Sequence, residues 1–319
     1  MLTVGFIGCG AVVHLLYAAA LRGRAAYAVR YVSDIAPRQA ESAADLFGAE
    51  VVPIDELIER SGAVVLTTPP DTHAALLRQC LRPGKIVLCE KPFATSYRDA
   101  VEISREAAAA GARLYVGHFR RTFPQLRLAR SLIQLGVIGD VSDIFISEGG
   151  RFTWKAVSDY TIKHPSGGVV WDTAPHSLDM ALFGAGLDDW PDCDVTVLDV
   201  ERDKPEPSHD FRARFLIDGG QPRRHISGRV HVSRKEALPN FLRLSGERGS
   251  VAFSVGMDRH VRLTTPSGSV VLTSEDQHAD LMECFDLQIR RILLHQQDED
   301  FSSNRFLALT KILEALANG

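Results

Sequence analysis

The sequence predicts an α/β protein whose first domain is a doubly wound parallel sheet and whose second, α+β domain holds a large open, mainly antiparallel sheet. Up to residue 118, short apolar runs alternate with longer amphipathic stretches, whereas beyond it strand-like segments follow one another mostly across turns. The chain has 319 residues, a length at the upper limit for one compact domain, and 45% of them are hydrophobic, enough to bury a sizeable core. We therefore expect two domains, at residues 1–118 and 119–319.

The first 118 residues show the repeated strand–helix alternation of a parallel sheet. Their strand-like runs are almost unbroken in apolar residues, as expected where helices cover both faces of a sheet. The amphipathic stretches between them are long enough for crossover helices. The runs are LTVGFI, VRYVSD, AVVLTT, KIVLCE and RLYVGH, and the helical stretches are 11–22, 37–47, 72–82 and 96–110.

The remaining residues predict an antiparallel sheet, after a helix that starts near Phe123. Along DFRARFLID, Phe211 and Phe215 would share one face while Arg212 and Arg214 take the other, as in a sheet with one packed and one wetter face. The strand-like segments are GDVSDIFISEGGRF, DFRARFLID, RRHISGRVHVS, NFLRLSG, GSVAFSV, HVRLTT and SVVLTS, and amphipathic helices near 276–296 and 303–317 end the chain.

Charge and cysteine usage exclude several classes of partner. With 36 basic and 40 acidic residues the net charge is −4, so we expect neither a nucleic acid nor a membrane as a partner. Apolar runs all fall short of the roughly 18 to 20 residues of a transmembrane helix. The five cysteines are scattered and never form a C-x-x-C pair, which indicates neither a disulfide framework nor a zinc module and favours the cytoplasm.

The motif GCGAVV directly follows the first strand and contains Gly8, Gly10, Ala11 and Val12. Gly8 permits a tight turn, and Gly10 lets a pyrophosphate approach the backbone at a helix N-terminus. The third position of G-x-G-x-x-G is Val13 rather than Gly or Ala, so a purely structural turn is the alternative. Its place inside a strand–helix–strand unit favours dinucleotide binding by a Rossmann domain.

Asp34 ends the second strand, on the order of 20 residues beyond the glycines. A carboxylate at this position accepts hydrogen bonds from the adenosine ribose, which favours NAD. It would repel a 2′-phosphate, although Arg38, one helical turn away, could offset that repulsion and admit NADP. The alternative interpretation of Asp34 is an N-cap for the helix at 37–47.

A lysine of fixed direction follows the strand KIVLCE. Lys91 stands between Glu90 and Pro92 at the carboxyl end of this strand, where open α/β sheets bind ligands. Because Pro92 disfavours helical geometry at Lys91, the lysine is expected on a stiff turn, as a catalytic group requires. A surface ion pair with Glu90 is the alternative.

The segment SGGVVWDTAPHSLDM opens with paired glycines and is expected to continue as one helix, with Asp172 and His176 four residues apart on one face. An imidazole accepts or donates a proton near neutral pH, and the carboxylate could orient it. A metal pair and a buried histidine without function are the alternatives. Because no third His or Cys stands at ligand spacing nearby, we expect no metal.

The motifs GFIGCGAVV, TTPPDTH, CEKP, GHFRR and GGVVWDTAPHSLDM occur in the order seen in the Gfo/Idh/MocA family of glucose-fructose, inositol and related sugar oxidoreductases, which the chain resembles from Leu2 to roughly Leu316. The E-K-P and D-x-x-x-H motifs are the specific part. The resemblance implies that Lys91, Asp172 and His176 line the substrate and that the second sheet mediates a homodimer or homotetramer. It also implies that four residues approach the cofactor, namely Thr68, Pro69, His73 and Glu90.

Together these features predict an NAD(P)-dependent oxidoreductase that moves hydride between nicotinamide and a secondary alcohol or ketone of a sugar, cyclitol or nucleotide-linked sugar. Lys91, Asp172 and His176 are its expected catalytic residues. One alternative is an NAD-dependent glycoside-cleaving enzyme of the same fold, without net redox change. Another is a non-catalytic nucleotide-sensing protein, which would not require Lys91 and His176 together.

Two features depart from the family pattern or leave a role open. Val13 stands in the glycine turn, and the bulky Trp171 precedes the aspartate, where it would narrow the substrate pocket. Arg121 and His118, in GHFRR, are expected to contact substrate. For Arg121, an ion pair at a helix start is the alternative.

Overall fold

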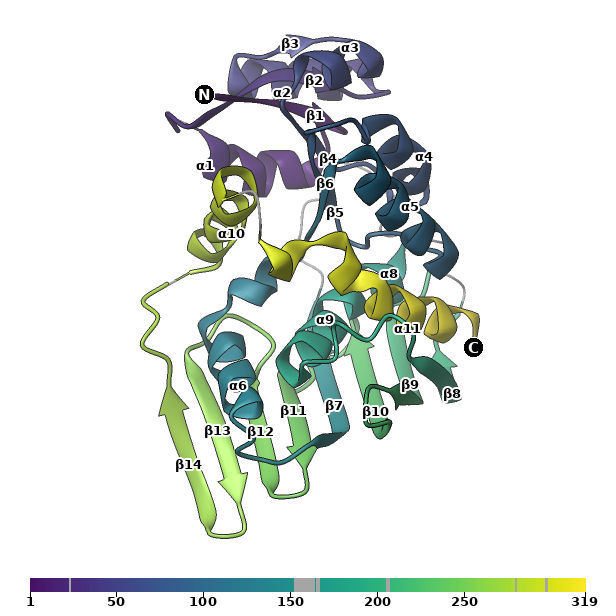
Figure 1. The fold of residues 1–319 in the computed structure, drawn as a ribbon, viewed down its shortest axis with the longest axis vertical. Helices are drawn as coiled ribbons and strands as arrows, with labels where there is room; N and C mark the ends of the chain where they lie inside the picture. The colour runs from purple at the N-terminus through teal and green to yellow at the C-terminus, as the bar shows by residue number, and fades with distance from the viewer. Residues whose placement is uncertain (23, 152–163, 165–166, 205–206, 279, 296–297) are drawn as a thin grey trace. The chain divides into compact units, whose positions relative to one another are not determined.

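The computed structural model describes residues 1–22, 24–151, 164, 167–204, 207–278, 280–295 and 298–319 (Figure 1). These residues form two compact units. The first comprises Met1–His118 and Met282–Asn304, and the second comprises the described parts of 119–281 together with Arg305–Gly319. The predicted fold class, a parallel Rossmann sheet and a second, mainly antiparallel sheet, is confirmed.

The described strands of the first unit form a parallel six-stranded sheet in the order β3-β2-β1-β4-β5-β6. The chain builds outward from β1 to β3 and then returns to the other side of β1 with β4. In open α/β sheets, ligands bind outside the carboxyl ends of the strands at such a reversal. The sequence pattern does not predict the two-residue β3. The strands are β1 Leu2–Ile7, β2 Tyr27–Ser33, β3 Glu50–Val51, β4 Ala63–Leu66, β5 Ile86–Glu90 and β6 Arg113–Gly117.

The helices of this unit begin and end at local sequence signals. A proline occupies the first turn of α2 and of α4, where its missing N–H leaves no hydrogen bond unmade. Gly48 and Gly111, which end α2 and α5, have left-handed φ angles of 65° and 67°. The helix predicted at 11–22 contains a π turn, η1, and α3 is an addition to the prediction. The bounds are η1 Val13–Tyr17, α1 Ala18–Leu21, α2 Pro37–Phe47, α3 Ile54–Arg60, α4 Pro70–Cys80 and α5 Tyr97–Ala110.

A segment near the end of the chain, Met282–Asn304, belongs to the first unit, which differs from the expected second domain at 119–319. It contains most of α10 (Leu281–Arg290), whose Phe285 is buried. The Phe285 ring lies edge-on to the Tyr17 ring, with 5.0 Å between the centroids. Amphipathic periodicity predicts such a helix but does not indicate which unit its apolar side packs against.

The described strands of the second unit form an eight-stranded sheet in the order β14-β13-β12-β11-β7-β10-β9-β8. Neighbouring strands are antiparallel except β7 and β10, which run parallel. The edge strand β8 is an addition to the strands expected from the sequence. The bounds are β7 Val141–Gly149, β8 Asp194–Arg202, β9 Asp210–Gly219, β10 Arg224–Ser233, β11 Phe241–Gly246, β12 Gly249–Ser254, β13 His260–Thr265 and β14 Gly268–Thr273.

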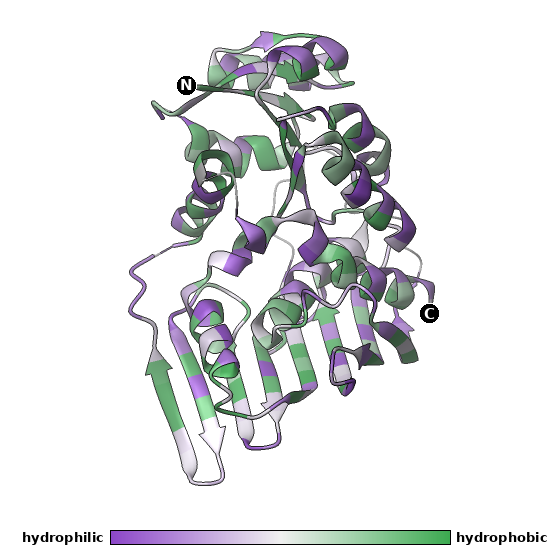
Figure 2. Ribbon diagram, in the orientation of Figure 1, coloured by the Kyte–Doolittle hydropathy of each residue, from purple (hydrophilic) through white to green (hydrophobic). Residues whose placement is uncertain are grey.

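One face of this sheet packs against helices, as the alternation along β9 predicts. Phe211 and Phe215 are buried, whereas Arg212 and Arg214 between them are exposed. Figure 2 shows hydrophilic and hydrophobic residues interleaved along these strands. α6 contacts β12 and β13, α9 contacts β7 and β11, and α11 contacts β8. Their bounds are α6 Pro124–Gln134, α9 Ala174–Ala185 and α11 Leu307–Asn318. In the part of the chain that the structure describes, every helix is too short or too polar to cross a bilayer.

Candidate functional site

The glycine turn after β1 leaves its backbone accessible. Gly8 has a φ of 91°, and a Cβ atom there would lie 2.8 Å from the carbonyl carbon of Thr67, so only glycine fits. A Cβ atom at Gly10 would meet no described atom beyond its neighbours within 4 Å. Ala11 and Val12 start the following helix and are partly exposed. The turn has the geometry that close approach of a pyrophosphate requires.

The Asp34 carboxylate, just beyond β2, accepts two backbone hydrogen bonds. Its Oδ2 accepts from the N–H of Cys9 at 2.7 Å and its Oδ1 from the N–H of Ala36 at 2.8 Å. The N-cap residue of α2 is Ala36, so Asp34 closes the turn before the helix instead of capping it. Each oxygen retains capacity for a further hydrogen bond, and Arg38 is exposed in the first turn of α2. These residues fit the adenosine half of an NAD molecule.

His73 joins the loops that follow β4 and β5. Its side chain is buried, with Nδ1 2.9 Å from the carbonyl oxygen of Pro92 and Nε2 2.9 Å from that of Thr68. Burial lowers the pKa of His73. The structure corrects the expectation that His73 itself approaches a cofactor, because its ring is directed at the two loops. Thr68 is partly exposed and Pro69 is exposed, so these two remain candidates for cofactor contact.

The Glu90 carboxylate, at the carboxyl end of β5, is held from two sides. The Tyr17 hydroxyl donates a hydrogen bond to Oε1 at 2.7 Å, and the backbone N–H of Lys91 donates to Oε2 at 3.2 Å. Burial raises the pKa of Glu90 above its usual value, and the Tyr17 hydrogen bond and the Lys91 charge offset part of this rise. Glu90 is therefore bound to the helix after the glycine turn and to the backbone of the candidate catalytic lysine.

In the second unit, Asp172 and His176 lie on two successive helices rather than on the single helix expected. α8 (Gly168–Asp172) ends at Asp172, and α9 begins with Pro175 in its first turn. A proline lacks the N–H that would continue the preceding helix, which explains the break. Trp171 and His176 are both partly exposed.

α8 is held by residues from a distant part of the sequence. The Asp172 carboxylate forms an ion pair with Arg234, which follows β10. The Val169 N–H donates a hydrogen bond to the carbonyl oxygen of Ser208 at 2.8 Å. Gly168 has a φ of 72°, and a Cβ atom there would lie 2.5 Å from the same oxygen. The direction of Asp172 is thus set by β10 and by the loop that precedes β9.

His176 presents its ring beside an aromatic side chain. The Phe119 ring lies 5.8 Å away between centroids, in an edge-on arrangement. A partly exposed imidazole can exchange a proton with a bound ligand.

Arg121 is a structural residue, so the expectation that it contacts substrate is wrong. Its guanidinium is 0% exposed, bonded to Asp179 at 2.6 Å and to Asp188 at 3.2 Å. The Phe306 ring covers it, with its centroid 4.0 Å from the guanidinium carbon. The ion-pair alternative is the observed one. His118 is buried as well, at 1% exposure.

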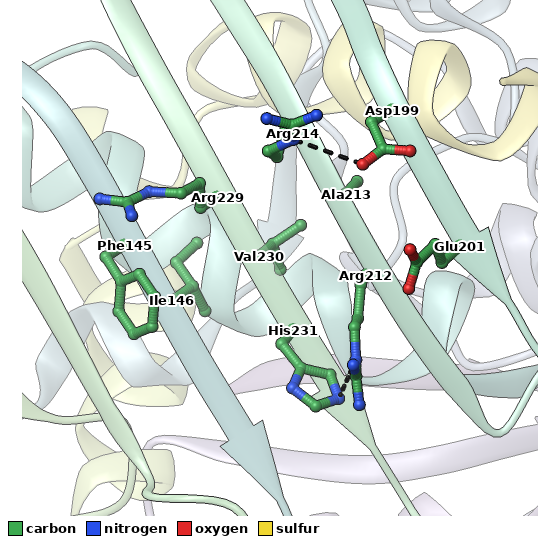
Figure 3. A pocket seen from close by; sticks show the side chains of 10 residues that line it. All are labelled: Phe145, Ile146, Asp199, Glu201, Arg212, Ala213, Arg214, Arg229, Val230 and His231. Carbon is green, nitrogen blue, oxygen red and sulfur yellow. Dashed lines mark hydrogen bonds and ion pairs between the residues drawn. The ribbon is translucent and has the colours of Figure 1, made fainter.

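The open face of the second sheet carries a shallow depression of about 230 Å³ (Figure 3). Charged side chains of β8, β9 and β10 line it together with the Phe145 ring. Arg214 donates a hydrogen bond to Asp199 at 3.3 Å, and Arg212 donates one to His231 at 3.1 Å. The acidic groups lie on the edge strand and the arginines on the strands beside it.

Within the described residues, the donor atoms of Asp210, His231 and Glu236 are close enough together to hold a metal ion. However, the Arg212 guanidinium lies 3.8 Å from each of the two carboxylates and bonds His231. A cationic side chain thus lies among these donor atoms and offsets part of the carboxylate charge that would attract a metal ion.

Two residues that support the candidate site, Tyr17 and Arg234, are not among the site residues predicted from the sequence. Tyr17 lies in a mostly apolar helix, where only its hydroxyl distinguishes it from a core residue. Arg234 lies 62 residues beyond its partner Asp172. Sequence spacing finds partners within one turn of a helix, not those that come together through a sheet.

Residues 2–118 match the profile of the GFO_IDH_MocA oxidoreductase family, which has an NAD-binding Rossmann fold, and the resemblance seen in the motifs is confirmed. Inositol 2-dehydrogenase of Rhizobium meliloti (strain 1021) is 35% identical over 184 residues, which cover 57% of this chain and 54% of that protein. The chain thus spans about half the length of this relative.

Two solved structures share the fold over the full chain. An oxidoreductase from Agrobacterium radiobacter in complex with NAD⁺, L-tartaric acid and magnesium has a TM-score of 0.76 at 22% identity, covering 100% of this chain and 97% of that one. KijD10, a 3-ketoreductase from Actinomadura kijaniata in complex with TDP-benzene and NADP, has a TM-score of 0.75 at 19% identity with the same coverage. At these identities the likeness establishes the fold.

Proposed function

Because residues 2–118 match the profile of the NAD-binding Gfo/Idh/MocA oxidoreductase family, we propose that the chain transfers hydride between nicotinamide and the secondary alcohol or ketone of a sugar, cyclitol or nucleotide-linked sugar. The observation that carries the proposal is the anchoring of Lys91. It follows β5 at the ligand-binding edge of the sheet, and Glu90 bonds its backbone to the helix after the glycine turn. The names of the matched dehydrogenase and ketoreductase support this substrate class.

When bound, the nicotinamide supplies the acceptor or donor of the hydride. The chain's own groups bind the partners and move the proton. In this proposal His176 exchanges the proton of the reacting oxygen, and the cationic Lys91 donates a hydrogen bond that stabilises the developing negative charge. Asp172, paired with Arg234, fixes the segment that carries His176.

The converse assignment makes Lys91 the base that takes the proton of the reacting oxygen. Lys91→Arg separates the two, because arginine keeps the positive charge and cannot lose its proton. Residual activity in Lys91→Arg well above that of Lys91→Ala supports charge stabilisation by Lys91. Equal loss in both variants supports Lys91 as the base.

Asp34 makes NAD the preferred cofactor in this proposal. Its carboxylate is fixed by Cys9 and Ala36, retains capacity to accept ribose hydroxyl groups, and would repel a 2′-phosphate. The exposed Arg38 admits NADP with lower efficiency.

The open face of the second sheet joins copies of the chain into a homodimer or homotetramer in the same proposal. Asp199 and Glu201 line one side of this face and arginines of β9 and β10 the other, so two copies related by a two-fold axis can pair opposite charges. The rings of Phe145 and Phe241 stack at 5.3 Å nearby and add apolar surface. Light scattering at micromolar concentration tests this, and a particle of 35.0 kDa would contradict it.

A panel of sugars, cyclitols and nucleotide-linked sugars with their keto forms, followed by nicotinamide absorbance with NAD and NADP, tests the activity. We expect stoichiometric cofactor turnover with at least one member. Product without net cofactor change would indicate the glycoside-cleaving alternative. Cofactor binding without conversion across the panel would indicate a nucleotide sensor.

A further inference from the structure

Tyr17 places a single hydroxyl inside an aromatic cluster of the first unit. It is the last residue of the π turn η1, which follows the glycine turn. Its ring is 0% exposed and lies edge-on to the Phe6 ring at 5.1 Å and to the Phe285 ring at 5.0 Å. Packing thus fixes the ring, and with it the direction of the hydroxyl.

The Tyr17 hydroxyl contacts the Glu90 carboxylate, for which the neighbouring strand leaves space. Glu90 is opposite Gly117 of the neighbouring strand, where a Cβ atom would come within 3.1 Å of Glu90 Oε1. Glycine at this position leaves the room that the carboxylate occupies. Tyr17 reaches Oε1 at 2.7 Å, while Oε2 accepts the N–H of Lys91 at 3.2 Å.

The two hydrogen bonds suit the ionised form of Glu90. A backbone N–H can only donate, and burial keeps the pKa of the Tyr17 hydroxyl well above its usual value, so the hydroxyl stays protonated and donates as well. Both carboxylate oxygens therefore act as acceptors. Two further titratable groups act on the pair. The Lys91 charge favours the ionised form of Glu90, and burial raises the pKa of the Cys89 thiol, which stays neutral.

We propose that Tyr17 is a positioning residue that keeps Glu90 ionised and bonded to the backbone of Lys91. The helix after the glycine turn and the turn that carries Lys91 are thereby held together. The inference rests on the proposed function, since it acts through Lys91. Tyr17 lies in the same π turn as Val13, the position at which the glycine motif departs from the family pattern. A phenylalanine would fill the same space without donating the hydrogen bond.

Tyr17→Phe tests the pairing without any substrate. The protein is labelled with ¹³C at glutamate carboxyl groups, the Glu90 resonance is assigned by its loss in Glu90→Gln, and its titration is followed in the cofactor-free protein. Loss of a hydrogen bond to a charged acceptor should raise the Glu90 pKa by about one unit. Tyr27→Phe is the matched control, because the Tyr27 hydroxyl is also buried and has no hydrogen-bond partner among the described residues. We expect that control to leave the Glu90 titration unchanged.

Kinetics provide the second readout. Tyr17→Phe should lower kcat about tenfold, leave the KM for NAD within about twofold, and shift the acid limb of kcat/KM to higher pH by about one unit. Glu90→Gln should lower kcat at least as much and leave only the acid limb of the proton-exchanging group, since the amide does not ionise. Thermal unfolding of each variant confirms that the fold is intact, and Glu90→Gln serves as the test if Tyr17→Phe does not fold.

Failure of the pairing and failure of the proposed function give different results. An unchanged Glu90 titration in Tyr17→Phe, or an acid limb in Glu90→Gln identical to that of the wild type, overturns the role of Tyr17 whatever the activity. A shifted titration together with normal activity of Lys91→Ala leaves the pairing in place but removes the catalytic role of Lys91, and with it the positioning proposal.

Discussion

The segment that carries Lys91 and the segment that carries His176 are supported in different ways. In the first unit, the lysine turn lies within the motif that contains its main support, because Glu90 immediately precedes Lys91 and bonds its backbone. In the second unit, α8 and α9 depend on partners far along the chain, namely Arg234 for Asp172 and Ser208 for Val169.

This difference shows when a sequence motif includes the residues that hold its functional side chain in place. The parallel sheet brings the loops after β1, β4 and β5 together at one edge, so residues next to strand ends meet by topology alone. The second segment is directed by side chains of an antiparallel sheet and a loop, whose register no local pattern specifies. Apart from Tyr17, which contacts Glu90 from 73 residues away, we therefore expect substitutions of distant residues to matter more for His176 than for Lys91.

The largest effect is expected from the two candidate catalytic residues themselves. Lys91→Ala and His176→Ala should each lower kcat by roughly 10²-fold or more, the usual scale for losing a positioned acid or base. The dissociation constant of NAD, measured by titration calorimetry, should change little, because neither group is proposed to hold the dinucleotide. Near-normal kcat in both variants would place the active site elsewhere in the fold.

Asp34→Ala should change the preference between NAD and NADP without affecting the segment that carries His176. Removal of the carboxylate takes away a ribose acceptor and the repulsion of a 2′-phosphate, so the ratio of kcat/KM for NAD to that for NADP should fall more than tenfold. Steady-state kinetics with both cofactors measure this ratio. A wild-type preference for NADP would instead identify Arg38 as a phosphate partner.

Arg234→Met tests long-range support of the second segment. Loss of the guanidinium removes the ion pair between Arg234 and Asp172, and kcat should fall about tenfold while NAD affinity is retained. Arg223→Met is the control, because Arg223 forms an exposed ion pair with Asp194 in the same unit. If the two variants behaved alike, the ion pair of Asp172 would have no part in positioning.

The smallest effect concerns the pH dependence of stability through His73. Burial lowers its pKa from the usual 6.5, so below about pH 6.5 the unfolded chain binds a proton that the folded ring does not, and stability falls as pH decreases. In His73→Gln this contribution should be absent. Denaturant unfolding between pH 5 and 8, compared between wild type and variant, measures it, and parallel curves would contradict the assignment.

The sequence predicts more of the first unit than of the second site segment, for physical reasons. Apolar runs and the positions of Gly8, Gly10 and Lys91 follow from local rules, and the structure places them at one sheet edge. For Arg121 the sequence offers an ion pair as an alternative but does not identify its carboxylate partners, because they lie 58 and 67 residues away. The π turn that orients Tyr17 also lacks a local signature.

The double variant Lys91→Ala/His176→Ala tests the central proposal, that Lys91 and His176 serve the same proton transfer. If two residues act on the same step, removing the second costs little once the first is lost. The kcat of the double variant should therefore be close to that of the less active single variant. The measurement is single-turnover nicotinamide absorbance of the wild type, both single variants and the double variant on one substrate. A loss equal to the product of the two single losses, roughly 10⁴-fold, would show that Lys91 and His176 act independently.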